Sequence, residues 1–294
     1  MSPKGIFNIG IKWIIALRAI FYKNRLTNLQ VGDFYLKAPA LHPLGVYMRK
    51  SPTYSRNFPR IVSLVSQTYP KPTIIDVGAN IGDTVALVHS TIQCPMVCIE
   101  GDDFYFKLLQ ENIKQFKDVT AHKYILGDSD GVSFGNLDTS LGSGMVKQSE
   151  NSTIPINTLD YFVKKNPEYS SAKILKIDTD GFDGKILRGA KKYLTNSKPV
   201  LFFEFDHYLL KENGDNGLKI LEDLEKNGYD KIFFYDNNGR LLVTTSLKEK
   251  CLISELYRYT YKKTGAFAYY DVCVFHKQDD TLAATSRTSE LSIS

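Results

Sequence analysis

Short apolar runs alternate with amphipathic segments along most of the chain after residue 70. The runs are rich in β-branched residues, and several end in an acidic residue or a glycine turn. Such runs are typical of buried strands, whereas the segments between them carry apolar residues at helical spacing. This alternation predicts an α/β protein with a mostly parallel sheet and helices on both faces. The expected strands are 73–77, 96–99, 119–126, 173–177, 199–205, 231–235, 241–244 and 269–276.

The segments between the strands predict helices that pack on the sheet. Asp102 and Asp103 are placed to cap one helix, and Asn238-Gly239 indicates a hairpin turn. A stretch rich in Gly, Ser and Asn, 129–152, allows a hairpin around 132–134 and is long enough to suggest a functional loop. Further helices are expected from Val85 onward, from Phe182 to Leu194 as one helix, and over 218–224 and 252–261.

The two ends of the chain differ in composition from its middle. Residues 1–60 carry ten Lys or Arg and one acidic residue, a charge of +9, so the rest carries −4 of the net +5. We expect a basic, partly helical extension at 1–70, one domain at 71–277, and a disordered polar tail at 278–294. The basic extension can contact anionic lipid, a phosphorylated glycan carrier or nucleic acid. The alternative is an ordinary solvated surface, which we favour.

Composition places the chain among globular proteins. It is 43% hydrophobic and 23% charged, and no run of 18 apolar residues predicts a membrane-spanning helix. The most apolar early segment, Ile11–Phe21, contains Lys12 and Arg18 and does not resemble a secretion signal. The four cysteines lack zinc-ligand and C-x-x-C spacing. This favours reduced thiols and a cytoplasmic location, with the basic extension able to touch the inner face of a membrane.

The stretch 72–84, PTIIDVGANIGDT, contains the clearest ligand signal. A strand reaches Asp76 near its end, and the chain turns through Gly78, Asn80 and Gly82 into a helix. This places a ligand at the carboxyl edge of a sheet. The glycine spacing is not the G-x-G-x-x-G of pyrophosphate sites, and Asp76 would repel a phosphate. An acidic residue here suits a ligand with an ammonium group and no phosphate, such as S-adenosylmethionine. The alternative is an ordinary strand-to-helix turn capped by Asp76.

Seven segments, in family order, resemble the FkbM family of S-adenosylmethionine-dependent methyltransferases. The resemblance implies a Rossmann-like class I methyltransferase fold, with a seven-stranded, mostly parallel sheet and an antiparallel last strand. Two features depart from the family pattern. Glu100 is followed by Gly101 instead of proline, and the pattern Asp-x-Glu-Gly-x-Glu has aspartates at 180 and 183. The segments are IIDVGANIGDT (74–84), CIEGDDFYFKLLQENI (98–113), ILGDSDG (125–131), INTLDYFV (156–163), ILKIDTDGFDGKILRGAKKYL (174–194), PVLFFEFDH (199–207) and YYDVCVFH (269–276).

The ends of the second and third strands add to the cofactor site. Glu100 can accept hydrogen bonds from both ribose hydroxyls, or it can be a charge that interacts with a helix dipole. Asp128 can hold the adenine amino group, or it can be a turn aspartate. The predicted cofactor-binding set is Asp76, Gly78, Asn80, Gly82, Glu100 and Asp128.

Methyl transfer to a hydroxyl requires in-line positioning and a proton acceptor. Asp178, which closes the fourth strand, is the first candidate for that acceptor, and Glu204 or His207 is the second. These carboxylates can alternatively hold a divalent cation that acidifies the hydroxyl. For Asp180 and Asp183, helix capping is the favoured interpretation.

Together these features predict an S-adenosylmethionine-dependent O-methyltransferase that acts on a hydroxyl of a glycan, glycolipid or secondary metabolite. One alternative is an N-methyltransferase or nucleic-acid methyltransferase, although the chain lacks interleaved aromatic and basic residues and an Asn-Pro-Pro-Tyr-like motif. The other is a binding protein that retains the fold without the chemistry.

Overall fold

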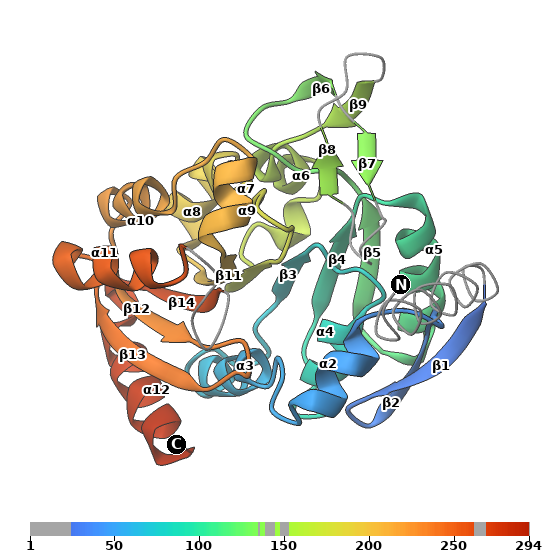
Figure 1. Ribbon diagram of the computed structural model, residues 1–294, viewed down its shortest axis with the longest axis horizontal. Coiled ribbons are helices and arrows are strands. Elements are labelled where there is room, and N and C mark those ends of the chain that lie inside the picture. The colour runs from blue at the N-terminus through green and yellow to red at the C-terminus, as the bar shows by residue number, and fades with distance from the viewer. Residues whose placement is uncertain (1–24, 135, 139–144, 148–152, 262–268, 294) are drawn as a thin grey trace, which may run out of the picture.

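The protein is built around one eight-stranded sheet, in the order β13-β12-β14-β11-β10-β3-β4-β5 (Figure 1). This is a computed structural model, and it describes residues 25–134, 136–138, 145–147, 153–261 and 269–293. Strands β3, β4, β5, β10 and β11 are parallel, and β14 pairs antiparallel with β11. The strands are β3 (Ile74–Val77), β4 (Met96–Glu100), β5 (Val119–Lys123), β10 (Ile174–Ile177), β11 (Val200–Phe205), β12 (Tyr229–Tyr235), β13 (Leu241–Ser246) and β14 (Tyr270–His276).

The predicted Rossmann-like class with an antiparallel last strand is therefore confirmed. The sheet has eight strands instead of seven because β13 returns antiparallel beside β12 after the Asn238-Gly239 turn. Three small two-stranded sheets lie outside it. They are β1 (Leu26–Val31) with β2 (Phe34–Pro39), β6 (Gly131–Phe134) with β9 (Thr153–Ile156), and β7 (Asn136–Asp138) with β8 (Met145–Lys147).

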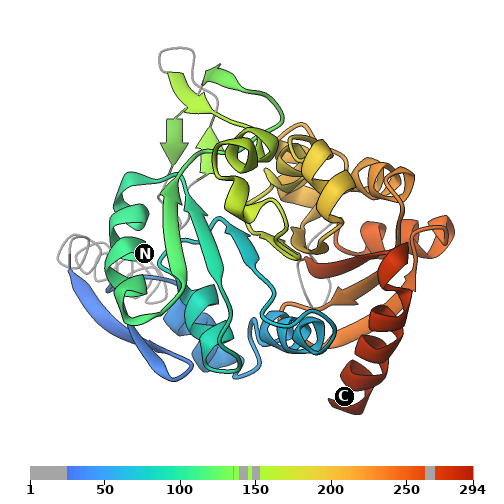
Figure 2. The ribbon, with the colours of Figure 1, turned by 180° about the vertical axis from the view of Figure 1, so that it is seen from behind.

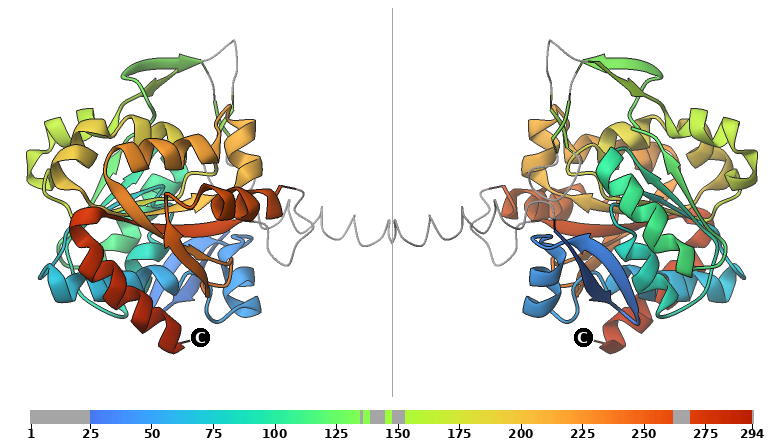
Figure 3. Two further views of the ribbon diagram at one scale, coloured as in Figure 1. Left: turned by 90° about the vertical axis from the view of Figure 1, so that its left-hand side faces the viewer. Right: turned by 90° about the vertical axis from the view of Figure 1, so that its right-hand side faces the viewer.

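Helices cover both faces of the sheet (Figures 1 and 3). Successive strand residues point to opposite faces, so Ile74 belongs to one core and Ile75 to the other. The first core receives α3, α4, α5 and α12, and the second receives α6 to α11. The helices are α2 (Leu44–Lys50), α3 (Asn57–Thr68), α4 (Asp83–His89), α5 (Asp103–Asn112), α6 (Leu159–Lys165), α7 (Asp183–Arg188), α8 (Lys191–Ser197), α9 (His207–Glu212), α10 (Gly217–Lys226), α11 (Lys250–Tyr259) and α12 (Asp280–Ile293), with short 3₁₀ turns at Ile113–Gln115, Pro167–Tyr169 and Lys277–Asp279.

The single helix expected from Phe182 to Leu194 is instead two helices, α7 and α8. A side chain at Gly189 would lie 2.0 Å from the carbonyl oxygen of Gly127, so the chain passes close to another backbone there. Asp160 then accepts hydrogen bonds from the backbone N–H groups of Lys192 and Tyr193, each at 2.9 Å. This distant carboxylate satisfies the first turn of α8 and allows a new helix to start.

The predicted boundary at residue 70 is not a boundary in the structure. The hairpin of β1 and β2 packs on the domain, and Val31 and Leu36 are fully buried in the first core. Asn112 of α5 accepts a hydrogen bond from the N–H of Lys37 at 2.7 Å and donates to its carbonyl oxygen at 2.9 Å. The described part of the extension therefore belongs to the domain. Residues 1–24 of the basic arm lie outside the described residues, as does part of the stretch 129–152.

The prediction of a disordered tail at 278–294 is wrong. Residues 280–293 form α12, which lies beside α3 (Figure 2). Arg60 of α3 binds Glu290 of α12 through two hydrogen bonds, Nε to Oε1 at 2.8 Å and Nη2 to Oε2 at 2.7 Å. Glu290 is only 2% exposed, so its charge is compensated by a residue 230 positions earlier. No helix among the described residues is long and apolar enough to cross a membrane.

Candidate functional site

The turn after β3 has the backbone geometry that its glycines predict. Gly78, Asn80 and Gly82 all have positive φ angles, of 82°, 47° and 87°. A Cβ on Gly78 would lie 1.9 Å from the carbonyl oxygen of Asp178, so only glycine fits where the ends of β3 and β10 meet. The N–H of Gly78 also donates to the carbonyl oxygen of Ile99 at 2.9 Å. The turn is thus held between the neighbouring strands.

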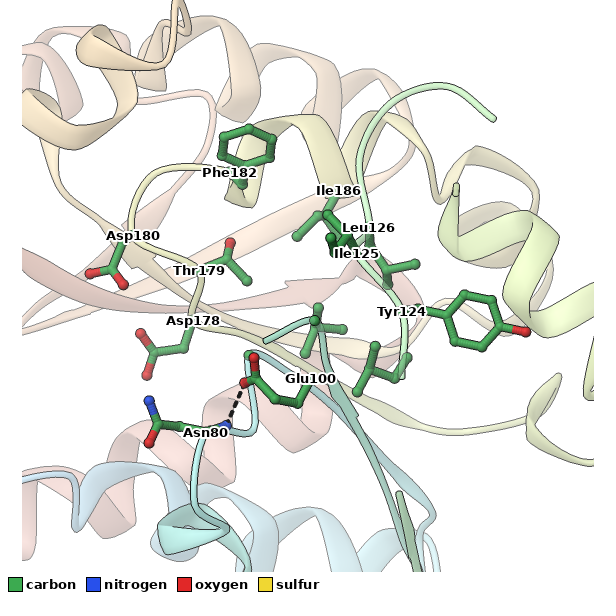
Figure 4. Close-up of a pocket in the computed structure, with 14 residues that line it drawn as sticks. Asn80, Glu100, Tyr124, Ile125, Leu126, Asp178, Thr179, Asp180, Phe182 and Ile186 are labelled. Atoms are coloured by element: carbon green, nitrogen blue, oxygen red, sulfur yellow. Dashed lines mark hydrogen bonds between the residues drawn. The ribbon is translucent and has the colours of Figure 1, made fainter. Parts of the chain in front are cut away.

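A narrow slot opens beside this turn, and Glu100 lies at its edge (Figure 4). Its Oε2 accepts a hydrogen bond from the N–H of Asn80, and its Oε1 accepts one from the N–H of Asp102, both at 2.8 Å. Burial raises the pKa of the Glu100 carboxyl, while these bonds favour the carboxylate. Each oxygen keeps a further lone pair, so Glu100 is oriented to accept hydroxyl groups in the slot, as predicted for a ribose.

The opposite part of the slot is apolar, which the sequence analysis missed. The apolar residues that line it lie at or after the carboxyl ends of β4, β5 and β10. Parallel sheets bind ligands at this edge, so their position in the sequence could have indicated a ligand contact. The slot is small, about 60 Å³, and is open to the neighbouring space on one side. The apolar lining residues are Ile99, Tyr124, Ile125, Leu126, Phe182 and Ile186.

A second cavity, of about 730 Å³, adjoins the slot. Gly78, Asn80, Asp178 and Asp180 line both spaces, so a ligand that fills the slot would face the second cavity at these residues. Residues 42–55 form one of its walls, which the sequence gave no reason to expect. The carboxylates that line this acceptor cavity, as we call it below, are Asp83, Asp178, Asp180, Glu204, Asp206 and Asp271.

Asp76 lines neither space, so its contact with a cofactor ammonium stays a prediction. Its side chain is fully buried, and Oδ1 lies 3.4 Å from Nζ of Lys176. The same ammonium donates a hydrogen bond to Oδ2 of Asp178 at 3.1 Å. Burial raises the pKa of Asp76 to about 6, and Lys176 opposes this shift. The partner of Asp76 is thus a lysine of the chain itself, directly beside it on β10.

Two further predicted residues lie outside both spaces. Asp128 is partly exposed and pairs with Arg188, with Oδ2 3.4 Å from Nη2. The His207 ring packs edge-on against Tyr257, with ring centroids 4.3 Å apart, and close to Tyr261. Burial lowers the pKa of His207. The structure therefore does not bring Asp128 to the slot or His207 to the acceptor cavity.

The aspartates that replace the family glutamates have different positions. Asp183 is fully buried and accepts hydrogen bonds from Oγ1 of Thr179 and the N–H of Gly181, both at 3.2 Å. Both donors precede α7, and among the described residues no side chain caps its first turn, so the favoured capping interpretation is not confirmed for Asp183. Burial raises the pKa of Asp183 to about 8. Asp180 instead lines both spaces and has a positive φ of 49°. Backbone strain of this kind is concentrated at functional sites.

The residues present fit S-adenosylmethionine. Glu100 can bind the ribose, the apolar end of the slot can enclose the adenine, and the turn from Gly78 to Gly82 can approach the methionyl part closely. Among the described residues, no group of three or more His, Cys, Asp or Glu side chains is placed to hold a metal ion.

Comparison with known proteins gives an independent result. The family profile of the methyltransferase FkbM domain matches residues 76–231, slightly more than half of the chain. A search of curated proteins finds no match.

Similar solved structures include a methyltransferase FkbM from Methylobacillus flagellatus (16% identity, TM-score 0.41), and the alignment covers 70% of this chain but only 44% of that one. An O-methyltransferase from Bacillus cereus, solved with SAH, has 11% identity and a TM-score of 0.44 over 80% of this chain and 88% of that one. A precorrin-6y C5,15-methyltransferase from Geobacter metallireducens has 12% identity and a TM-score of 0.38 over 74% and 87%.

Proposed function

This chain belongs to the FkbM methyltransferase family, and we propose that it transfers a methyl group from S-adenosylmethionine to a hydroxyl of a glycan, glycolipid or secondary metabolite. The observation that carries the proposal is the position of Asp178, whose side chain lines both the slot and the acceptor cavity. A carboxylate at this junction lies where a cofactor and an acceptor would meet.

The cofactor supplies a methyl group on a positively charged sulfur, and the chain has to bind and orient it. Glu100 accepts hydrogen bonds from the ribose, and its two backbone contacts hold it in position beforehand. Gly78 lets the backbone approach the ligand, whereas Gly82 lines neither space and packs toward Leu109. Correct orientation supplies much of the rate of such a transfer, because the displacement needs little beyond in-line geometry.

Asp178 is the proton acceptor in this proposal. A sugar or alkyl hydroxyl is almost un-ionised at neutral pH, so its proton has to pass to a base within hydrogen-bond reach. The hydrogen bond from Lys176, at 3.1 Å, fixes the orientation of the Asp178 carboxylate. Glu204 lines only the acceptor cavity, on the next strand away from the slot, and is therefore the second candidate.

Replacement of Asp178 by asparagine tests the proposal. The variant keeps the shape of the side chain but loses the proton acceptor, so turnover should fall by about 10²–10⁴-fold. Calorimetry should show S-adenosylmethionine affinity within a few-fold of wild type. Asp128→Asn is the matched control, since Asp128 lies outside the slot, and it should change neither quantity. Normal turnover in folded Asp178→Asn protein would move the proton acceptor to Glu204.

The acceptor cavity argues against the nucleic-acid alternative. Its lining contains six carboxylates and two lysines, and a polyphosphate chain would be repelled there. Turnover of the cofactor with any acceptor would exclude the alternative of a binding protein without chemistry. Contact of the basic arm with anionic membrane stays a prediction, because residues 1–24 lie outside the described residues.

A further inference from the structure

The acceptor cavity contains more negative charge than its own cations can compensate. Only Lys50 and Lys176 contribute ammonium groups to its described lining. Lys176 already lies 3.1 Å from a carboxylate oxygen of Asp178 and 3.4 Å from one of Asp76. The carboxylates farther from Lys176 must therefore be compensated in another way.

Two of these carboxylates, Glu204 and Asp271, are direct neighbours. They form an opposed pair across the antiparallel strands β11 and β14, and such pairs have Cβ atoms about 4.5–5.5 Å apart. Both line the acceptor cavity. Like charges at this distance destabilise a sheet. The pair is thus a costly arrangement for the protein alone.

The carboxylates of Glu204 and Asp271 differ in their hydrogen bonds. Oδ2 of Asp271 accepts a hydrogen bond from Nδ2 of the fully buried Asn57 at 3.0 Å. Oε2 of Glu204 is enclosed by protein and has no hydrogen-bond partner among residues 25–134, 136–138, 145–147, 153–261 and 269–293. Burial raises the pKa of Asp271 to about 7 and that of Glu204 well above its usual value. An enclosed acceptor without a donor, on the wall of a cavity, indicates that a ligand supplies the donor.

We propose that Glu204 and Asp271 bind an ammonium group of the methyl acceptor, so that the acceptor carries both an amine and the hydroxyl to be methylated. This inference rests on the proposed function, since it places the acceptor in the same cavity. Among the described residues, the pair does not belong to a set of three or more metal-ligating side chains placed around an ion. An organic ammonium needs no such set. The tyrosines Tyr54 and Tyr269 line the same cavity, and aromatic rings attract ammonium groups.

The sheet limits how far the amine lies from the reacting hydroxyl. Asp178 follows β10, Glu204 is on the adjacent β11, and Asp271 is on β14, one strand further. Neighbouring strands are about 4.8 Å apart, so the ammonium site lies roughly one to two strand spacings, about 5–10 Å, from Asp178. An amine and a hydroxyl on one sugar ring or on adjacent rings meet this requirement, as does a short amino alcohol.

The test measures binding of small probes to the full chain saturated with S-adenosylhomocysteine. The probes are glucosamine, ethanolamine, glucose and glucuronate, measured by calorimetry with saturation-transfer NMR for weak binders. We expect glucosamine to bind at least tenfold more tightly than glucose, as a charged hydrogen bond implies, and glucuronate to bind most weakly. Glucosamine above ethanolamine would identify an amino sugar, and the reverse order an amino alcohol. Equal affinity for glucose and glucosamine, or no binding of either amine, would overturn the inference.

Substitutions test whether Glu204 and Asp271 cause the preference for amine probes. Glu204→Gln and the double variant Glu204→Gln/Asp271→Asn should remove the preference for the amine while keeping affinity for S-adenosylhomocysteine within a few-fold. The single variant keeps the test valid if the double variant does not fold, and Asp128→Asn is the control. Retention of the preference in folded Glu204→Gln and double-variant protein would also overturn the inference. If wild-type protein does not bind S-adenosylhomocysteine, the proposed function itself is refuted.

Discussion

Glu100→Ala removes an interaction that serves both the fold and the cofactor site. In the free protein the carboxylate accepts two backbone hydrogen bonds, from Asn80 and Asp102, each at 2.8 Å. A hydrogen bond to a charged group contributes about 1.5–3 kcal/mol. For two such bonds we therefore expect the free energy of unfolding to fall by about 3–6 kcal/mol, measured by urea denaturation.

Loss of the ribose contact has a separate effect on binding. A further charged hydrogen bond of about 1.5–3 kcal/mol corresponds to a dissociation constant for S-adenosylmethionine about 10- to 150-fold higher. Calorimetry below the denaturation range measures this change. Glu100→Gln keeps one acceptor oxygen and should lie between alanine and wild type in both assays. The control is Asp103→Asn, because Asp103 is exposed at the start of α5 and pairs with Lys123 at the surface. Unchanged cofactor affinity in folded Glu100→Ala protein would refute the ribose assignment.

Three further predictions concern the turn, a buried acid and the chain ends. Gly78→Ala should abolish S-adenosylmethionine binding in a calorimetric assay, because its Cβ would lie 1.9 Å from a carbonyl oxygen. Gly214→Ala is the control, since Gly214 has a similar φ of 75° and no described atom within 4 Å of an added Cβ, and it should lose only about 1–2 kcal/mol of stability. Equal effects of the two substitutions would contradict the steric argument. The raised pKa of Asp183, about 8, means that its contribution to stability is complete below pH 4 and is lost as pH rises through 8. The free energy of unfolding of Asp183→Asn, measured by urea denaturation, should therefore increase relative to that of wild type between pH 5 and 8. A difference between the two proteins that does not change with pH would contradict the raised pKa of Asp183. Arg60→Met should cost about 3–5 kcal/mol because it removes the guanidinium that pairs with the buried Glu290 carboxylate, and the double variant with Glu290→Met should recover most of that loss. A double variant as unstable as the single one would contradict this account.

The strands of the sheet and the turn at Gly78 could be predicted, because both depend on residues that are close together in the sequence. Each expected strand of the sheet is present, since buried runs bounded by turn residues leave few alternatives. The turn at Gly78 was predictable for the same reason, because glycine spacing reports backbone conformation directly. The place of Glu100 beside the slot was predictable because Glu100 ends a buried strand, where a parallel sheet presents its ligand edge, while its role toward the ribose stays a prediction.

The errors arose where a distant residue decides the outcome. The tail was predicted to be disordered from its polar composition, but Glu290 is buried because Arg60 reaches it from α3. The ion pair of Asp76 with Lys176 on the neighbouring strand could not be predicted, because the two residues are far apart in the sequence. The wall of the acceptor cavity formed by residues 42–55 could not be predicted either, since only the tertiary structure brings it to the sheet edge.

The position of β14 also determines the order in which the protein can be completed. Strands β12 and β13 precede β14 in the chain, yet they are hydrogen-bonded to the rest of the sheet only through it. On the ribosome, residues 229–246 therefore emerge as a hairpin with no place in the sheet until His276 has been synthesised. Asp271, which forms half of the carboxylate pair, arrives with the same strand. The nascent chain thus exposes an unpaired strand edge on β11, a surface at which partly made chains can associate, and the acceptor cavity is completed only after β14 has been made.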